Sequence, residues 1–194
     1  TDCTSIILKY NYAAVIKNAG GTFKSKNQLI ITPVNSLIYA EDYLNEPCGV
    51  SIDMPVDFDI ASSMETTMEV ANYYELAATP IICSKKIQRD IYEVNETKFH
   101  IVIEGDVSPD WNKLKKDFKK FTQDQIDLFG EFPCSDYYFL NLFFPEKHYH
   151  GVEHLNSTLI ALGPDTDFNK QAFYLNFLGI SSHELFHFWN ICRI

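Results

Sequence analysis

Residues 179–194 read GISSHELFHFWNICRI, and this stretch constrains the fold more than any other part of the sequence. Its apolar residues continue a helical pattern over residues 169–193, although Gly179 weakens a helix by about 1 kcal/mol relative to Ala. His183 and His187 fall inside this predicted helix. Because residues four apart lie on one helical face, about one turn from each other, the helix should present two imidazoles side by side.

The two histidines and the glutamate beside the first have the spacing of a zinc site. Ring nitrogens of His183 and His187 can converge on one zinc ion at ~2.1 Å. Glu184 can then accept the proton of a water whose pKa zinc lowers to about 7, which is the chemistry of peptide-bond hydrolysis. The alternative is a surface helix with two incidental histidines. The aromatic residues around the pair favour a largely buried helix, in which histidines need partners.

A catalytic zinc needs three protein ligands and an open position. One arrangement has Gly three residues after the second His and a third His three further on, but those positions hold Asn190 and Arg193. The other arrangement uses a Glu on a later helix, and no such helix follows before Ile194. We therefore expect the third ligand beyond residue 194, and the chain as given to be inactive and to bind zinc weakly. Apolar surface left on the last helix should also favour self-association.

Working back from the helix, the pattern alternates between strand and helix. Residues 157–162 and 137–144 are short apolar runs typical of buried strands. Residues 146–150 between them read as a polar loop. Residues 108–130 predict a helix, because Pro and acidic residues stand in the first turn, apolar residues recur at helical spacing and a Gly follows.

The first hundred residues are β-rich. Residues 28–32, 50–54 and 97–103 combine β-branched residues with alternation of apolar and polar side chains, which predicts short strands of a sandwich. We place a domain boundary near residue 105, giving a β-rich domain over 1–104 and an α and β domain over 105–194. The predicted fold class is α+β.

Composition narrows the class of protein. Hydrophobic residues make up 46% and charged residues 22%, which is typical of a soluble globular chain. The net charge of −10 disfavours nucleic acid and anionic lipid surfaces as partners. Five scattered cysteines form no metal or disulfide pattern and read as small buried thiols. No apolar run reaches the ~20 residues of a membrane span, and no targeting signal is visible, so the localisation stays open.

A second cluster, Gly151-Val152-Glu153-His154, lies upstream of the histidines. Alone it reads as a polar loop that leads into an edge strand. In zinc peptidases, however, a strand edge beside the zinc helix binds the substrate backbone by strand addition. A carboxylate at that edge, such as Glu153, could hold the charged amino terminus of a substrate, which would make the enzyme an aminopeptidase.

With both clusters in view, the chain resembles the glycyl aminopeptidase family of zinc metallopeptidases. Residues 179–194 look like that family's active-site helix, with Trp-Asn after the second His and Arg-Ile after that. Residues 151–158, GVEHLNST, look like its Gly-x-Glu-His-x-Asn-Ser strand. Residues 54–61 and 73–76 resemble its amino-terminal β-domain more loosely, and the usual Asp-Ser-Pro appears as ATP at residues 78–80.

The resemblance implies a β-sandwich-like domain followed by a thermolysin-like catalytic domain, of which this chain would hold the first and the opening part of the second. It implies a zinc cofactor and a peptide substrate, with amino-terminal glycine as the first choice to test. The residues that carry over are the zinc ligands His183 and His187, the general base Glu184, and the substrate-contacting Gly151, Glu153 and His154.

Two other functions stay open. The chain could be a catalytically inactive relative that keeps the motif as a scaffold. It could also be a binding module whose β-domain recognises a peptide or another protein.

Overall fold

The protein folds around one five-stranded sheet with a smaller sheet packed against it. The structure, a computed structural model, describes residues 5–64 and 68–193. The large sheet has the order β10-β11-β9-β8-β7. Strand β9 pairs parallel with β8 on one side and with β11 on the other. The edge strands β7 and β10 pair antiparallel with β8 and β11. A four-stranded antiparallel sheet has the order β1-β2-β6-β4, and β3 pairs with β5 in a third, two-stranded sheet.

The strands are β1 (Phe23–Lys24), β2 (Gln28–Ile31), β3 (Cys48–Gly49), β4 (Asp59–Ser62), β5 (Glu69–Val70), β6 (Ile81–Ser84), β7 (Ile87–Val94), β8 (Thr97–Glu104), β9 (Asp136–Phe143), β10 (His148–Glu153) and β11 (Ser157–Gly163). The helices are α1 (Pro33–Ser36), η1 (Glu41–Tyr43), α2 (Tyr73–Ala77), α3 (Trp111–Phe129), η2 (Asp165–Asp167) and α4 (Gln171–Phe186).

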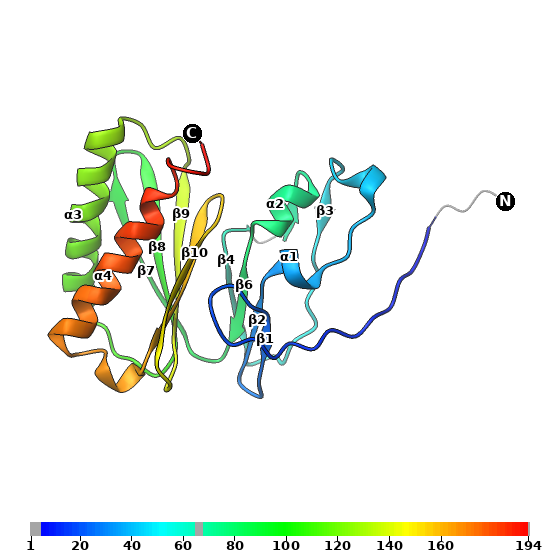
Figure 1. Cartoon of the computed structure of the whole chain (residues 1–194), viewed down its shortest axis with the longest axis horizontal. Coiled ribbons are helices and arrows are strands. Elements are labelled where there is room, and N and C mark those ends of the chain that lie inside the picture. The colour runs from blue at the N-terminus through cyan, green and yellow to red at the C-terminus, as the bar shows by residue number, and fades with distance from the viewer. Residues whose placement is uncertain (1–4, 65–67, 194) are drawn as a thin grey trace.

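The large sheet is covered on both faces. Helices α3 and α4 lie side by side over one face, and the four-stranded sheet lies on the other (Figure 1). The helix-side core contains Phe118 of α3, Phe139 of β9 and Phe177 of α4, all fully buried. On the opposite face, Val102 of β8 packs with Ile30 of β2. Because successive strand residues point to opposite faces, β8 and β9 supply both cores and read as nearly continuous apolar runs.

Several predicted elements are confirmed. The helix predicted over 108–130 is α3, which Asp110 caps by accepting a hydrogen bond from the Lys113 N–H at 3.1 Å. It ends at Gly130, whose φ of 97° is readily adopted only by glycine. The strands predicted at 28–32, 97–103, 137–144 and 157–162 correspond to β2, β8, β9 and β11. The chain is a mixed α and β structure with several sheets.

Other predictions were wrong in part. Residues 50–54 form no strand. Their alternation is real, because Ile52 and Met54 pack toward the small core of the first half. The backbone N–H of Val50 still donates to the Met68 carbonyl at 3.0 Å, but the β3–β5 ladder ends at Gly49 and does not continue through residues 50–54. The loop predicted over 146–150 ends early, since β10 begins at His148. An edge strand with one face toward solvent carries the polar residues that suggested a loop. The boundary placed near residue 105 stays a prediction; it falls just after β8, which pairs with β9 in one sheet.

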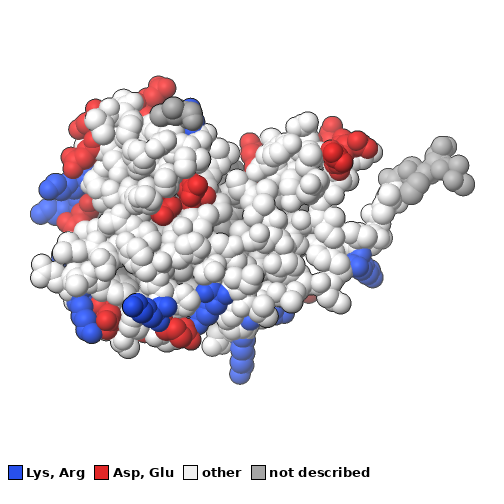
Figure 2. Space-filling view, in the orientation of Figure 1, with Lys and Arg blue, Asp and Glu red and all other residues white. Residues whose placement is uncertain are grey.

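The face drawn in Figure 2 has scattered acidic and basic residues, large uncharged areas and no extended basic region.

Among the described residues, none of the helices combines the length and apolar character needed to cross a membrane.

Glu104 is a buried carboxyl at the junction of the two larger sheets. It is 2% exposed, and its Oε1 accepts hydrogen bonds from Ser84 Oγ at 2.8 Å and from Gln28 Nε2 at 3.2 Å. Glu104 Oε2 and Gln28 Oε1 are both buried without a partner among the described residues. Burial raises the pKa of Glu104, against the opposing effects of the Ser84 hydrogen bond and the Lys86 charge. A protonated carboxyl, which can donate a hydrogen bond, fits these surroundings.

We therefore expect Glu104→Gln to change how stability depends on pH. The folded chain holds the Glu104 proton to a higher pH than the unfolded chain, in which the usual pKa is 4.5. Stability should fall as pH rises from that value through the raised pKa of the folded state, and then level off. The neutral glutamine removes this fall. Urea unfolding of both proteins between about pH 4 and pH 8 measures the difference.

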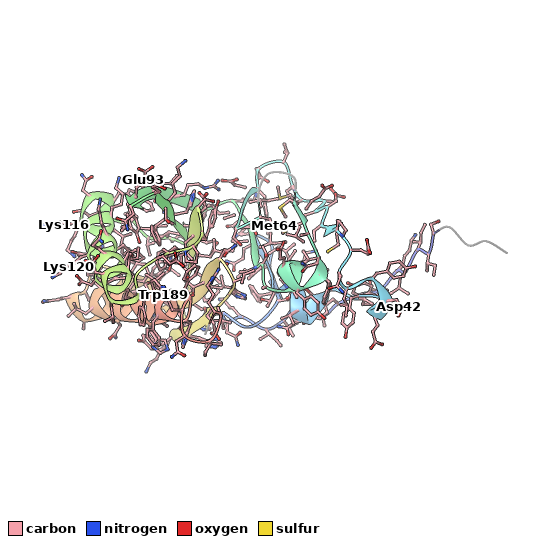
Figure 3. All side chains as sticks on the ribbon, turned by 90° about the horizontal axis from the view of Figure 1, so that it is seen from above. Asp42, Met64, Glu93, Lys116, Lys120 and Trp189 are labelled. Atoms are coloured by element: carbon pink, nitrogen blue, oxygen red, sulfur yellow. The ribbon has the colours of Figure 1, made fainter. Side chains whose placement is uncertain are left out.

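The matched control is Glu93→Gln, at an exposed position of β7 that Figure 3 shows near α3 and away from the four-stranded sheet. This variant should keep the pH dependence of the unmodified chain. Equal pH dependence in the Glu104 variant and the unmodified chain would mean that Glu104 is ionised in the folded protein.

Candidate metal centre

Helix α4 carries the predicted zinc motif and buries one side of it. Phe177, Ile180 and Leu185 fix the helix on the large sheet. Glu184 is 5% exposed, whereas His183 is exposed and His187 is half-buried. The expectation that both histidines are buried was wrong, because the helix turns its apolar residues and Glu184 inward and leaves the imidazoles at the rim.

The two imidazoles are close enough to share one metal ion. Their Nε2 atoms lie 3.2 Å apart, and the two rings are almost perpendicular. Two nitrogens each ~2.1 Å from a tetrahedral zinc are separated by ~3.4 Å. Nδ1 of His187 lies 3.2 Å from the Asn190 carbonyl oxygen. Donation of Nδ1–H to this carbonyl leaves Nε2 as the metal-binding nitrogen.

Strand β10 brings the second cluster against α4. It is an edge strand, paired on one side with β11, with Gly151 opposite Ile160 and Glu153 opposite Thr158. A Cβ atom on Gly151 would lie 2.3 Å from Glu184 Oε1 and 2.8 Å from Glu184 Cγ. The Glu184 side chain therefore occupies the space that any larger residue at position 151 would need.

The carboxylates meet the second histidine at this contact. Three side chains come close enough to hold one metal ion. Each of Glu153, Glu184 and His187 has one potential ligand atom within 4.8 Å of those of the other two. Burial raises the pKa of Glu184 to about 7, with the nearby Glu153 carboxylate acting in the same direction and His187 against it. Glu184 Oε2 is buried and has no hydrogen-bond partner among the described residues. A buried carboxyl with a free oxygen and a pKa near neutrality suits a general base.

His154 lies deeper than its neighbours. It is 9% exposed, and burial lowers the pKa of its imidazole to about 4, so the ring is neutral near neutral pH. Its ring Nε2 is buried without a partner among the described residues, and its backbone N–H donates to the Ser157 carbonyl at 2.9 Å. None of its ring atoms belongs to the metal-binding group, so the structure keeps His154 near Glu153 but apart from the histidine pair.

The donor set fits zinc. Imidazoles and carboxylates are ligands that zinc accepts, and the 3.2 Å separation of the two Nε2 atoms matches a shared ion. The structure brings residues 151–153 together with residues 183–187. Arg193, which the sequence shows only as part of a motif, lies near this cluster. Its hydrogen bonds to Leu155 and Asn156 join residues 38 and 37 positions apart, a separation that no local pattern reports. Ile194, the last residue of the quoted motif, lies outside the described residues.

Comparisons with known proteins found one family model and similar solved structures. Residues 1–85 match the family model described as the peptidase M61 N-terminal domain. The chain superposes on the crystal structure of an aminopeptidase N family protein from Idiomarina loihiensis with a TM-score of 0.82 and 22% identity, covering 92% of this chain. This likeness shows a shared fold. An M1 zinc metallopeptidase from Deinococcus radiodurans aligns over 90% of this chain with a TM-score of 0.49 and 14% identity.

The chain spans 33% of the length of the first of these structures and 42% of the second. A search of curated proteins gave no match.

The contact between Gly151 and Glu184 predicts the effect of Gly151→Ala. The added methyl group must displace the Glu184 side chain, which is flexible enough to move without unfolding the sheet. Any activity of the full-length protein that uses the Glu184 carboxyl as a base should fall by at least about tenfold, since a misplaced base loses most of its contribution, while thermal stability changes little.

Gly179→Ala is the matched control. No atom lies within 4 Å of a Cβ at this exposed helical position. This substitution should raise stability by up to about 1 kcal/mol and leave activity unchanged. Full activity in Gly151→Ala would show that the close approach is not needed for function.

Proposed function

We propose that the chain is part of a zinc-dependent aminopeptidase of the glycyl aminopeptidase kind, with a thermolysin-like arrangement of the catalytic half. The observation that carries the proposal is the meeting of His183, His187 and Glu184 with Glu153 at the end of an edge strand. The family match over residues 1–85 and the shared fold support a peptidase. The activity and substrate of the whole protein are proposals.

In this proposal each residue has a separate role. His183 and His187 hold zinc as two of its protein ligands. When bound, zinc supplies the Lewis acidity that makes water a nucleophile near neutral pH. Glu184 accepts the proton of the attacking water and later donates it to the leaving amine.

Strand β10 and Glu153 would orient the peptide. The free edge of β10 can hydrogen-bond the backbone of an extended substrate as an added strand. Gly151 keeps that edge narrow, and the Glu153 carboxylate pairs with the charged amino terminus. Because this carboxylate lies close to His187, the first peptide bond of the substrate is the one that reaches the zinc ligands. His154 would help to shape the same end of the cleft, and amino-terminal glycine is the first residue to test.

Glu184→Gln in the full-length protein tests the general base. Glutamine keeps the shape of the side chain but cannot take a proton, so turnover should fall by at least about a hundredfold. Zinc content, measured by mass spectrometry after dialysis, should stay at one ion per chain. His187→Ala is the control, and it should lose both zinc and activity. A nearly fully active Glu184→Gln would refute the assigned role.

Glu153→Gln separates substrate binding from metal binding. We expect zinc content to be retained and KM for peptides with a free amino terminus to rise by about tenfold or more, because an ion pair becomes a neutral contact. Steady-state kinetics on glycyl and alanyl peptides would measure this. Loss of zinc in the variant would instead identify Glu153 as a metal ligand.

A further inference from the structure

Arg193 joins the chain that follows α4 to the turn that follows β10. Its Nη1 donates to the carbonyl oxygens of Phe188 at 3.1 Å and Leu155 at 3.3 Å. Its Nη2 donates to the Leu155 carbonyl at 3.3 Å and to Asn156 Oδ1 at 3.1 Å. The same guanidinium lies 3.6 Å from the centre of the Phe188 ring. One planar group therefore bonds both segments that build the candidate site.

The backbone is shaped to bring this side chain back toward the turn. Ile191 has a φ of 107°, a left-handed conformation that a β-branched residue adopts only when its surroundings impose it. Before it, Trp189 anchors the segment by donating Nε1–H to the Glu131 carbonyl at 3.0 Å and by stacking on Phe129. The strained residue lies between this anchor and Arg193, so the contacts on its two sides hold it in place.

The turn that Arg193 bonds begins directly after Glu153 and His154. Glu153 is the carboxylate assigned to the substrate's amino terminus, and it lies within 4.8 Å of His187 in the grouping described above. The position of Glu153 relative to α4 depends on how the β10–β11 turn is tied to the end of that helix. Among the described residues, Arg193 supplies the side-chain hydrogen bonds that tie this turn to the segment after α4.

We propose that Arg193 is a positioning residue that fixes the Glu153 carboxylate at the right distance from the zinc ligands. It would thereby set the selectivity of the enzyme for ligands that carry a free α-amine. This inference rests on the proposed function. Lysine cannot replace Arg193 here, because three rotating donors on one nitrogen do not reproduce the fork that reaches three acceptors and the ring face at once.

The test compares two inhibitors on the zinc-loaded full-length enzyme. Glycine hydroxamate and acetohydroxamate share the zinc-binding group and differ by one amine. In the unmodified enzyme, pairing of this amine with Glu153 should make glycine hydroxamate the tighter inhibitor by about tenfold or more. In Arg193→Lys that advantage should fall to about threefold or less, while the inhibition constant of acetohydroxamate stays within about twofold.

Two further variants serve as a matched control and as a chemical-rescue test. Arg89→Lys makes the same change at the chain's other arginine, which donates to the Ile60 carbonyl at 3.1 Å, and it should keep the full amine advantage. In Arg193→Ala, sub-denaturing methylguanidinium should restore part of the advantage by filling the vacated space. Thermal melting and zinc content confirm that each variant is folded and loaded.

The outcomes are distinct. The positioning role would be overturned if Arg193→Lys weakened both inhibitors in parallel or left both inhibition constants unchanged. An unmodified, zinc-loaded enzyme that binds neither hydroxamate would refute the proposed peptidase itself, and this inference with it.

Discussion

The close approach of α4 to the backbone of β10 is the constraint on which the candidate site depends. The approach is possible because Gly151 has no side chain and the Glu184 carboxyl fills the space beside it. This contact removes Glu184 from water and sets it next to Glu153 and His187. Burial, which raises the pKa of Glu184 to about 7, is thus a direct result of packing a helix on a strand at a glycine.

The large sheet makes that contact rigid. Strand β10 is an edge strand, yet its partner β11 is buried throughout and pairs in parallel with β9. The cores on both faces of the sheet then fix these strands, with fully buried residues such as Phe139 on the helix side and Leu159 on the other. The outer edge of β10 therefore lies on a frame that the two cores already hold in place, and little ordering would remain to be done on binding a ligand.

The sequence predicted the parts of this arrangement that are set locally. Helix α3 was predicted from its apolar spacing, from the Pro and acidic residues at its start and from the Gly after it. Strands β9 and β11 were predicted from their apolar runs and β8 from its alternation. The pair His183 and His187 was predicted because their spacing follows from helical geometry alone. The strand predicted over residues 50–54 was wrong, because alternation shows which side chains are buried but not whether the backbone pairs as part of a strand.

What could not be predicted depends on contacts between distant parts of the chain. The exposure of His183 follows from how α4 is rotated on the sheet, and α4 is apolar on most of its surface, so its sequence does not single out one buried face. The contact of Gly151 with Glu184 joins residues 33 positions apart. Glu104 reads as the polar end of a strand in the sequence, and only the packing of the two sheets shows that it is buried.

The long motif of residues 179–194 can be divided by what its two halves do. The first half places His183 and Glu184 at the end of a helix, where their chemistry is decided by spacing and burial. After His187 the helix ends, and the residues that follow contact other segments: Trp189 bonds the Glu131 carbonyl and Arg193 bonds the turn after β10. A helix that simply continued would carry these side chains away from both partners. Because the helix ends at the second histidine and Ile191 takes a strained conformation beyond it, one short stretch can hold both the histidine pair and the strand that faces it.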